Sequence, residues 1–164
     1  MKLRTPMRVA AATVAVAVGV LGLASPARAA DPGVTKNSIL LGSTSPLSGP
    51  ASTGYLYIPQ AAKAYFDYVN ANGGINGRNV SLMAYDDQYN PATTQAKTNQ
   101  LILNDKVFAM FGALGTDPHA TVIDTLNQRG IPDVFINTGA SQFGNAKKYP
   151  WTTPYFPSYA VEAK

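Results

Sequence analysis

Residues 111–119 read FGALGTDPH, and this short stretch places groups that could contact a ligand in one turn. An apolar run ends at Gly112, and Gly115 and Thr116 follow before Asp117 and Pro118. Glycines let backbone N–H groups approach a ligand closely, and free N–H groups at a helix start favour anions. We interpret the turn as half of a carboxylate-binding site. The alternative is a plain strand-to-helix turn in which Thr116 and Asp117 act only as caps.

A second small-residue loop, TGAS at 138–141, follows the next apolar run of the chain. Its Ser141 offers another hydroxyl group. A single loop serine carries little functional weight by itself. Because the two loops are expected at neighbouring strand ends, their coincidence favours one shared ligand site.

Catalysis has little support in the residues. His119 is the only histidine and the sequence has no cysteine, so a Cys–His pair is excluded. Asp86 and Asp87 are adjacent carboxylates, but neighbours in an extended segment point to opposite sides, so turn formation or capping is the favoured role. GALGT does not match a dinucleotide-binding fingerprint, and the sequence has no histidine cluster with the spacing of metal ligands. We expect no enzyme activity, no catalytic residues, no metal and no cofactor.

Strand and helix patterns alternate along the rest of the chain. Apolar or alternating runs predict strands over 39–41, 79–87, 106–112 and 131–137, and helical spacing predicts helices over 55–74, 91–105 and 119–130. Asn90 before Pro91 is expected to cap the second helix, and Asp117 before Pro118 the third. This order predicts an α/β fold with an open parallel sheet and flanking helices. Ligands bind such sheets at the carboxyl ends of the strands.

The first thirty residues resemble a secretory signal peptide. Basic residues at 1–8 precede an apolar run over 9–24, and small residues predict cleavage after Ala29 or Ala30. We therefore expect residues 1–30 to be a signal peptide and 31–164 to be the mature domain, located outside the cytoplasm in the periplasm or secreted. A membrane anchor is the disfavoured alternative, because Gly19, Gly22 and Pro26 interrupt the apolar run.

Charge and cysteine content limit the partners of the mature domain. Four of the 13 Lys and Arg lie in residues 1–30, which leaves nine basic residues against the 9 Asp and Glu. A neutral domain gives no support to a nucleic-acid partner. Without cysteine the chain has neither a disulfide nor a lipobox for a lipid anchor.

The ordered set of motifs resembles a known family. GVTKNSILLGSTSPLSGPAS, ANGGINGRNVSLMAYDDQYNP, FGALGT, TGAS and PWTTPYFPSY occur in the order typical of branched-chain-amino-acid-type, leucine-binding-protein-like substrate-binding proteins of ABC importers. The resemblance covers residues 33–159. It implies one lobe of a type I periplasmic-binding-protein fold, a branched-chain or other small amino acid or an amide as ligand, and an ABC permease in the membrane as partner.

The resemblance also implies the positions of the ligand contacts. Three residues match the first substrate loop of the family, namely Leu114, Gly115 and Thr116, and three match the second, namely Gly139, Ala140 and Ser141. In the second loop a backbone carbonyl takes the ligand ammonium and a hydroxyl takes the carboxylate. Tyr55 is the nearest candidate for an aromatic residue beside the ligand, although gapless counting puts Gly54 at that position. An interlobe or surface aromatic is the alternative for Tyr55.

Family members continue well beyond the position that corresponds to Lys164, so the resemblance implies that a second lobe is absent from this sequence. The expected function is ligand capture in a two-lobed cleft for import. A fragment of a ligand-sensing ectodomain and a non-functional remnant are the alternatives.

Overall fold

The computed structural model describes residues 31–164, so the signal peptide predicted over 1–30 lies outside the described residues. Five parallel strands form one sheet in the order β2-β1-β3-β4-β5. The strands are β1 (Ser38–Ser45), β2 (Asn79–Asp86), β3 (Ala109–Phe111), β4 (Asp133–Ile136) and β5 (Thr152–Pro154). The predicted α/β class with an open parallel sheet is confirmed.

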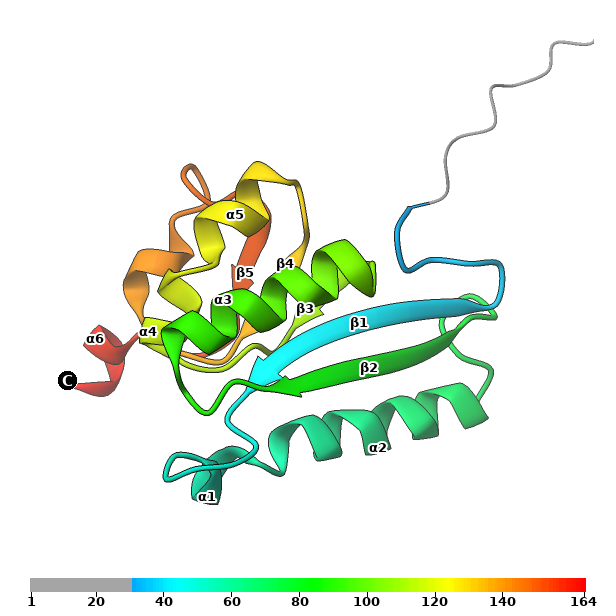
Figure 1. Cartoon of the computed structure of the whole chain (residues 1–164), viewed down its shortest axis with the longest axis horizontal. Helices are drawn as coiled ribbons and strands as arrows, with labels where there is room; N and C mark the ends of the chain where they lie inside the picture. The colour runs from blue at the N-terminus through cyan, green and yellow to red at the C-terminus, as the bar shows by residue number, and fades with distance from the viewer. Residues whose placement is uncertain (1–30) are drawn as a thin grey trace, which may run out of the picture.

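Helices lie on both faces of the sheet, as Figure 1 shows for α2 and α3 on opposite sides of β1 and β2. The helical segments are α1 (Ser52–Tyr55), α2 (Ile58–Ala71), α3 (Pro91–Asn99) continuing as a π-helix (Gln100–Asn104), α4 (Thr116–Ala120), α5 (Ile123–Gln128), a 3₁₀ turn (Ser141–Gly144) and α6 (Tyr159–Glu162). Within residues 31–164 we find no helix with the length and apolar character needed to cross a membrane.

Alternating side chains of the strands supply a separate core to each face. Toward α2, Val80 and Leu82 of β2 pack with Phe66, and Ile39 and Leu41 of β1 join them. Toward α3 and α5 the core is larger and contains Leu101, Ile102, Val107, Met110, Val122 and Leu126, with Leu40 and Met83 against it. Both faces of the sheet centre are therefore covered, as parallel strands require.

A row of aromatic rings crosses the sheet on the α2 side. Phe66 of α2 lies 5.3 Å from Phe111 of β3, Phe111 lies 5.9 Å from Phe135 of β4, and Phe135 lies 5.9 Å from Tyr155, as measured between ring centroids. Phe135 has φ 59° at an irregularity in the pairing of β4 with β5. The row is buried at Phe66 and becomes exposed at Phe135 and Tyr155.

The structure departs from the prediction at the third helix. The helix predicted over 119–130 is two short helices, α4 and α5, and α4 begins at Thr116 with Gly115 as its N-cap, so the predicted Asp117 cap is wrong. Gly115 has φ 109°, a conformation that glycine adopts readily and other residues rarely do. The helix therefore begins directly after Gly115, and Asp117 already lies in its first turn. The Asn90 cap is confirmed, since its side chain accepts hydrogen bonds from the Ala92 and Thr93 N–H groups.

The short strand β5 has no counterpart in the sequence-based prediction. It contains only three residues, Thr152–Pro154, and its polar sequence carries no alternation of apolar residues.

Candidate functional site

A cavity of about 270 Å³ lies at the carboxyl ends of the strands, where the sheet rule places ligands. Each of the first four strands contributes to it through the loop that follows: Tyr55 after β1, Tyr89 after β2, Gly115 after β3 and Thr138 after β4. The complete lining is Tyr55, Tyr89, Leu114, Gly115, Asn137, Thr138, Gly139, Phe156, Tyr159 and Glu162. The cavity is therefore built by loops that are far apart in sequence.

Backbone hydrogen bonds fix the loops after β3 and β4 against each other. The Asn137 N–H donates to the Ala113 carbonyl at 2.8 Å and the Gly115 N–H donates to the Asn137 carbonyl at 3.4 Å, while the Leu114 N–H ties the first loop to the Thr44 carbonyl of β1 at 3.0 Å. Leu114 and Asn137 also form an isolated parallel bridge. These contacts extend the sheet by one residue pair and hold Gly115 beside Thr138.

Three hydroxyl groups form a chain beside the cavity, which Thr138 and Tyr159 line and Thr116 does not. Thr116 Oγ1 lies 2.6 Å from Thr138 Oγ1, and Thr138 Oγ1 lies 3.2 Å from the Tyr159 hydroxyl. The Ala140 N–H also donates to Thr138 Oγ1 at 3.3 Å. Each hydroxyl carries one proton, and the two contacts among them consume two protons. If these are the two contacts that form, one O–H proton is available to another acceptor.

The tyrosines pack closely on the glycines of the site. A Cβ atom at Gly115 would lie 2.7 Å from Cε2 of Tyr89, and one at Gly139 would lie 2.5 Å from Cδ1 of Tyr159. Only glycine permits such close approach of the rings to the backbone. The Tyr159 N–H also donates to the Gly139 carbonyl at 2.8 Å, so α6 is attached directly to the second loop.

The tyrosine hydroxyls have shifted acidity. Burial raises the pKa of Tyr89 above its ordinary value, and this outweighs the lowering by its hydrogen bond with the Thr116 backbone. Hydrogen bonding with the Thr138 side chain, followed by the Gly139 backbone, lowers the pKa of Tyr159. Because the ordinary tyrosine pKa of about 10 is raised further at Tyr89, this hydroxyl is a neutral hydrogen-bonding group near pH 7.

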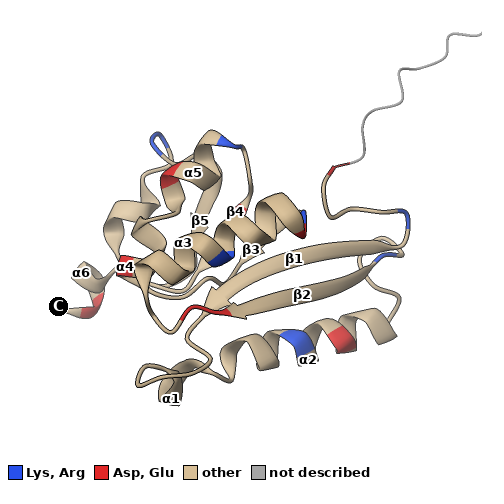
Figure 2. Cartoon of the chain, viewed as in Figure 1, with Lys and Arg blue, Asp and Glu red and all other residues tan. Residues whose placement is uncertain are grey.

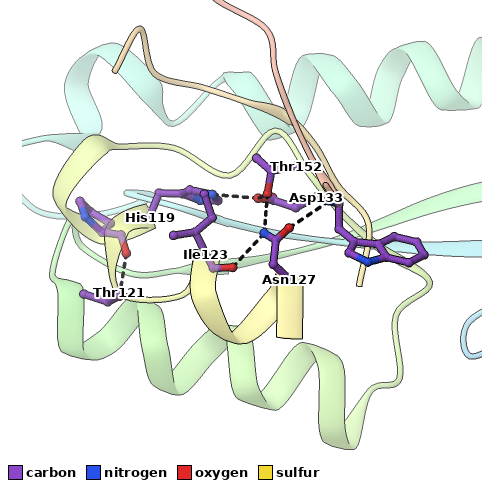
Figure 3. A network of polar contacts seen from close by, with 8 residues as sticks. His119, Thr121, Ile123, Asn127, Asp133 and Thr152 are labelled. Carbon is purple, nitrogen blue, oxygen red and sulfur yellow. Dashed lines mark hydrogen bonds and ion pairs between the residues drawn. The ribbon is translucent and has the colours of Figure 1, made fainter. Parts of the chain in front are cut away.

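A buried polar network anchors the helices that follow the first loop, as seen in Figure 3. His119 Nε2 of α4 lies 2.8 Å from Asp133 Oδ2 of β4, and Thr152 of β5 donates to the same oxygen at 3.2 Å. Asn127 of α5 donates to Thr152 Oγ1 at 2.8 Å and accepts from the Trp151 N–H at 2.9 Å. The position of Thr116, three residues before His119, thus depends on contacts deep in the domain.

The adjacent carboxylates Asp86 and Asp87 hold loops. Asp86 accepts from the Leu47 and Ser48 N–H groups and from the Ser48 hydroxyl, and although burial acts to raise its pKa, these hydrogen bonds lower it overall. Asp87 is buried, which raises its pKa, and it accepts from the Tyr89 N–H and the Thr94 hydroxyl. The turn and capping role favoured by the sequence accounts for both side chains.

Four of the seven sequence-predicted ligand residues line the cavity: Tyr55, Leu114, Gly115 and Gly139. Thr116 does not line the cavity, but its hydroxyl contacts that of Thr138, which does. Ala140 and Ser141 line an adjacent cavity of about 180 Å³, which shares Thr138, Gly139 and Phe156 with the first. A direct role of these seven residues in ligand binding stays a prediction.

The sequence reasoning missed further lining residues. Tyr89 lies in a strand-exit loop whose residues were assigned to turn formation. Asn137 directly precedes the loop at 138–141, and Thr138 lies in that loop but was not assigned a ligand contact. Phe156, Tyr159 and Glu162 come from the last segment of the chain. Its sequence carries no signal for folding back over the loop at 138–141, because that placement depends on tertiary contacts.

The geometry can be compared with known proteins. A family model described as periplasmic binding protein matches residues 38–164. The chain belongs to this periplasmic binding protein family. The sequence-based resemblance to branched-chain-amino-acid-type substrate-binding proteins is thereby confirmed.

Relatives within the periplasmic binding protein family are binding proteins by name. An amino acid binding protein from Pseudomonas aeruginosa is 32% identical over 94 residues, which cover 57% of this chain and 25% of that protein. A possible leucine/isoleucine/valine-binding protein from Rhodopirellula baltica is 28% identical with a TM-score of 0.67, covering 82% of this chain and 35% of that one. A substrate-binding periplasmic protein from Ralstonia solanacearum is 28% identical with a TM-score of 0.70, and the match covers 76% of this chain and 35% of that one. The chain thus spans about a third or less of the length of these relatives.

Proposed function

We propose that this chain is the first ligand-binding lobe of an extracytoplasmic solute-binding protein that delivers a small amino acid or its amide to an ABC permease. The cavity at the strand ends binds the ligand, and the protein performs no chemistry on it. The names of the relatives support this class, since they include an amino acid binding protein and a possible leucine/isoleucine/valine-binding protein.

The observation that carries the proposal is the hydroxyl chain of Thr116, Thr138 and Tyr159. Its remaining proton can be donated to a ligand carboxylate, and a hydrogen bond to a charged acceptor is about twice as strong as one between neutral groups. Of the described residues that line the cavity, none is Lys, Arg or His. A carboxylate would therefore be held by hydroxyl and backbone dipoles rather than by an ion pair.

The size of the cavity agrees with a small ligand. Its volume of about 270 Å³ is just below the range of roughly 300–1,000 Å³ for small-molecule sites. The aromatic lining provides apolar surface for a ligand side chain, while Asn137 and the hydroxyl chain offer the few polar contacts that fix orientation.

The test is a titration of the purified chain with L-leucine, followed by NMR at the backbone amides of Gly115, Thr116 and Gly139. Thr116→Val removes the hydroxyl at one end of the chain, and we expect it to weaken binding by about 1.5–3 kcal/mol, or roughly 10- to 150-fold in Kd. Thr116→Ser keeps the hydroxyl and should bind like the unmodified chain. Equal affinity of the Val and Ser variants would refute the carboxylate contact.

A further inference from the structure

The row of aromatic rings on the α2 side of the sheet continues onto α2 itself. Tyr65 lies 6.5 Å from Phe66 and 6.3 Å from Tyr68, as measured between ring centroids. One unbroken row of six rings therefore runs from α2 across β3 and β4 to the end of β5. This aromatic row consists of Tyr68, Tyr65, Phe66, Phe111, Phe135 and Tyr155.

Four rings of the aromatic row are exposed to solvent. Tyr65, Tyr68 and Tyr155 are 64%, 65% and 68% exposed, and Phe135 is 47% exposed. On this face α2 packs with residues of β1 and β2, and the described chain leaves Phe135 and Tyr155 uncovered. An aromatic side chain has about 150–250 Å² to bury, so the four rings expose roughly 350–600 Å². A patch of this size equals the largest apolar patch of a typical soluble monomer, about 300–600 Å², and such patches often mark interaction sites.

The backbone of β4 produces the exposure of Phe135. Side chains alternate along a regular strand, so Phe135 would share the face of Asp133, which is fully buried on the side of α4 and α5. An irregularity in the pairing with β5 lies between Val134 and Ile136, and Ile136 instead packs with Ile123 of α5. Phe135 has φ 59° there, which is unfavourable for a bulky side chain. The chain thus adopts a strained conformation that presents an aromatic ring to solvent.

We propose that the aromatic row is the interface through which two copies of this chain form a dimer. A two-fold axis across the row places the same patch of each copy against the other. The rings then pack in the offset and edge-to-face pairs that aromatic side chains prefer. The exposed rings of two copies supply roughly 700–1,200 Å², and a specific interface buries at least about 1,200 Å² in total. The rings therefore form the core of the interface, and their neighbours form its rim.

Charge favours a second copy over other partners. The nine basic residues of 31–164 balance the 9 acidic ones, so two copies do not repel each other at long range. Figure 2 shows basic and acidic segments interspersed along the chain, and α2 carries one of each, so it adds no net charge beside the row. Surfaces that bind anionic lipid carry Lys or Arg beside their apolar residues, and the row contains neither. None of its six residues lines the ligand cavity, so the proposal does not rest on the proposed function.

Sedimentation equilibrium of the purified chain, from low to several hundred micromolar, tests the proposal with three variants. Phe135→Asn removes a central ring, and asparagine tolerates the positive φ at that position. Tyr155→Ser removes a ring that is 68% exposed, so the core stays intact. Tyr57→Ser is the matched control, because Tyr57 is 66% exposed and lies outside the row. Circular dichroism establishes that each variant is folded.

We expect a monomer–dimer equilibrium with a Kd in the micromolar range, as suits an interface at the small end of the specific class. Phe135→Asn and Tyr155→Ser should each raise that Kd about tenfold or more, the effect of losing a central aromatic contact, while Tyr57→Ser should leave it unchanged. A chain that stays monomeric over the whole range would overturn the proposal, including one that co-sediments with phosphatidylglycerol vesicles instead. A dimer that persists unchanged in both row variants, or a mass that rises past the dimer without a plateau, would overturn it as well.

Discussion

Gly115→Ala is the substitution for which the structure gives the sharpest expectation. Gly115 has φ 109°, which side-chain-bearing residues rarely adopt. A Cβ atom there would lie 2.7 Å from Tyr89 Cε2 and 3.0 Å from Pro118 Cγ. The added methyl group must therefore strain the backbone and also displace the Tyr89 ring, which lines the ligand cavity.

The two costs can be separated with a matched glycine. Gly73 at the end of α2 has φ 98°, and nothing lies within 4 Å of a Cβ atom built there. Gly73→Ala thus carries the backbone cost of about 1–2 kcal/mol without a clash. Gly115→Ala adds overpacking of about 1–3 kcal/mol, so we expect its free energy of unfolding to fall by about 2–5 kcal/mol.

Urea denaturation measures the unfolding free energies, and the NMR titration with L-leucine measures binding. Gly115→Ala should lose more stability than Gly73→Ala, and it should also lose ligand-induced shifts at Thr116 and Gly139, which Gly73→Ala should retain. The reasoning would be refuted if both variants lost the same stability and bound L-leucine equally well.

Two further predictions concern buried and partly buried carboxylates. Asp133→Ala leaves His119 Nε2 and the Thr152 hydroxyl without their shared acceptor, so urea denaturation should show a loss of about 3–5 kcal/mol, and a loss near zero would contradict the anchoring role of the network. Hydrogen bonds lower the pKa of Asp86 below 3.8 in the folded state, although burial opposes this shift. The resulting stabilisation is present above the unfolded pKa and is lost as pH falls through the folded value. Unfolding free energy measured against pH should therefore fall more steeply below about pH 4 for the unmodified chain than for Asp86→Asn, and parallel curves would argue against this assignment.

The sequence predicted the elements that carry strong local signals. Val80 and Leu82 alternate, the helix containing Phe66 has regular apolar spacing, and Asn90 precedes Pro91, so their roles were readable without tertiary information. The short strand β5 pairs with β4 through backbone groups, which any polar sequence can supply, and it left no pattern to detect.

The candidate site was only partly predictable for the same reason. Gly115 and Gly139 stand in loops whose small residues mark close approach to a ligand or a ring. Tyr89 and Tyr159 come to the cavity through packing on those glycines, an arrangement that depends on the position of whole loops. The hydroxyl chain through Thr138 likewise requires the loops after β3 and β4 to lie side by side.

The crystal structure of this chain grown with saturating L-leucine tests the central claim most directly. Our account predicts the amino acid in the cavity between Gly115 and Gly139, with its carboxylate at the hydroxyl chain of Thr116, Thr138 and Tyr159. The account would be contradicted by an empty cavity, or by L-leucine bound elsewhere, such as the hollow beside Phe143 and Lys148.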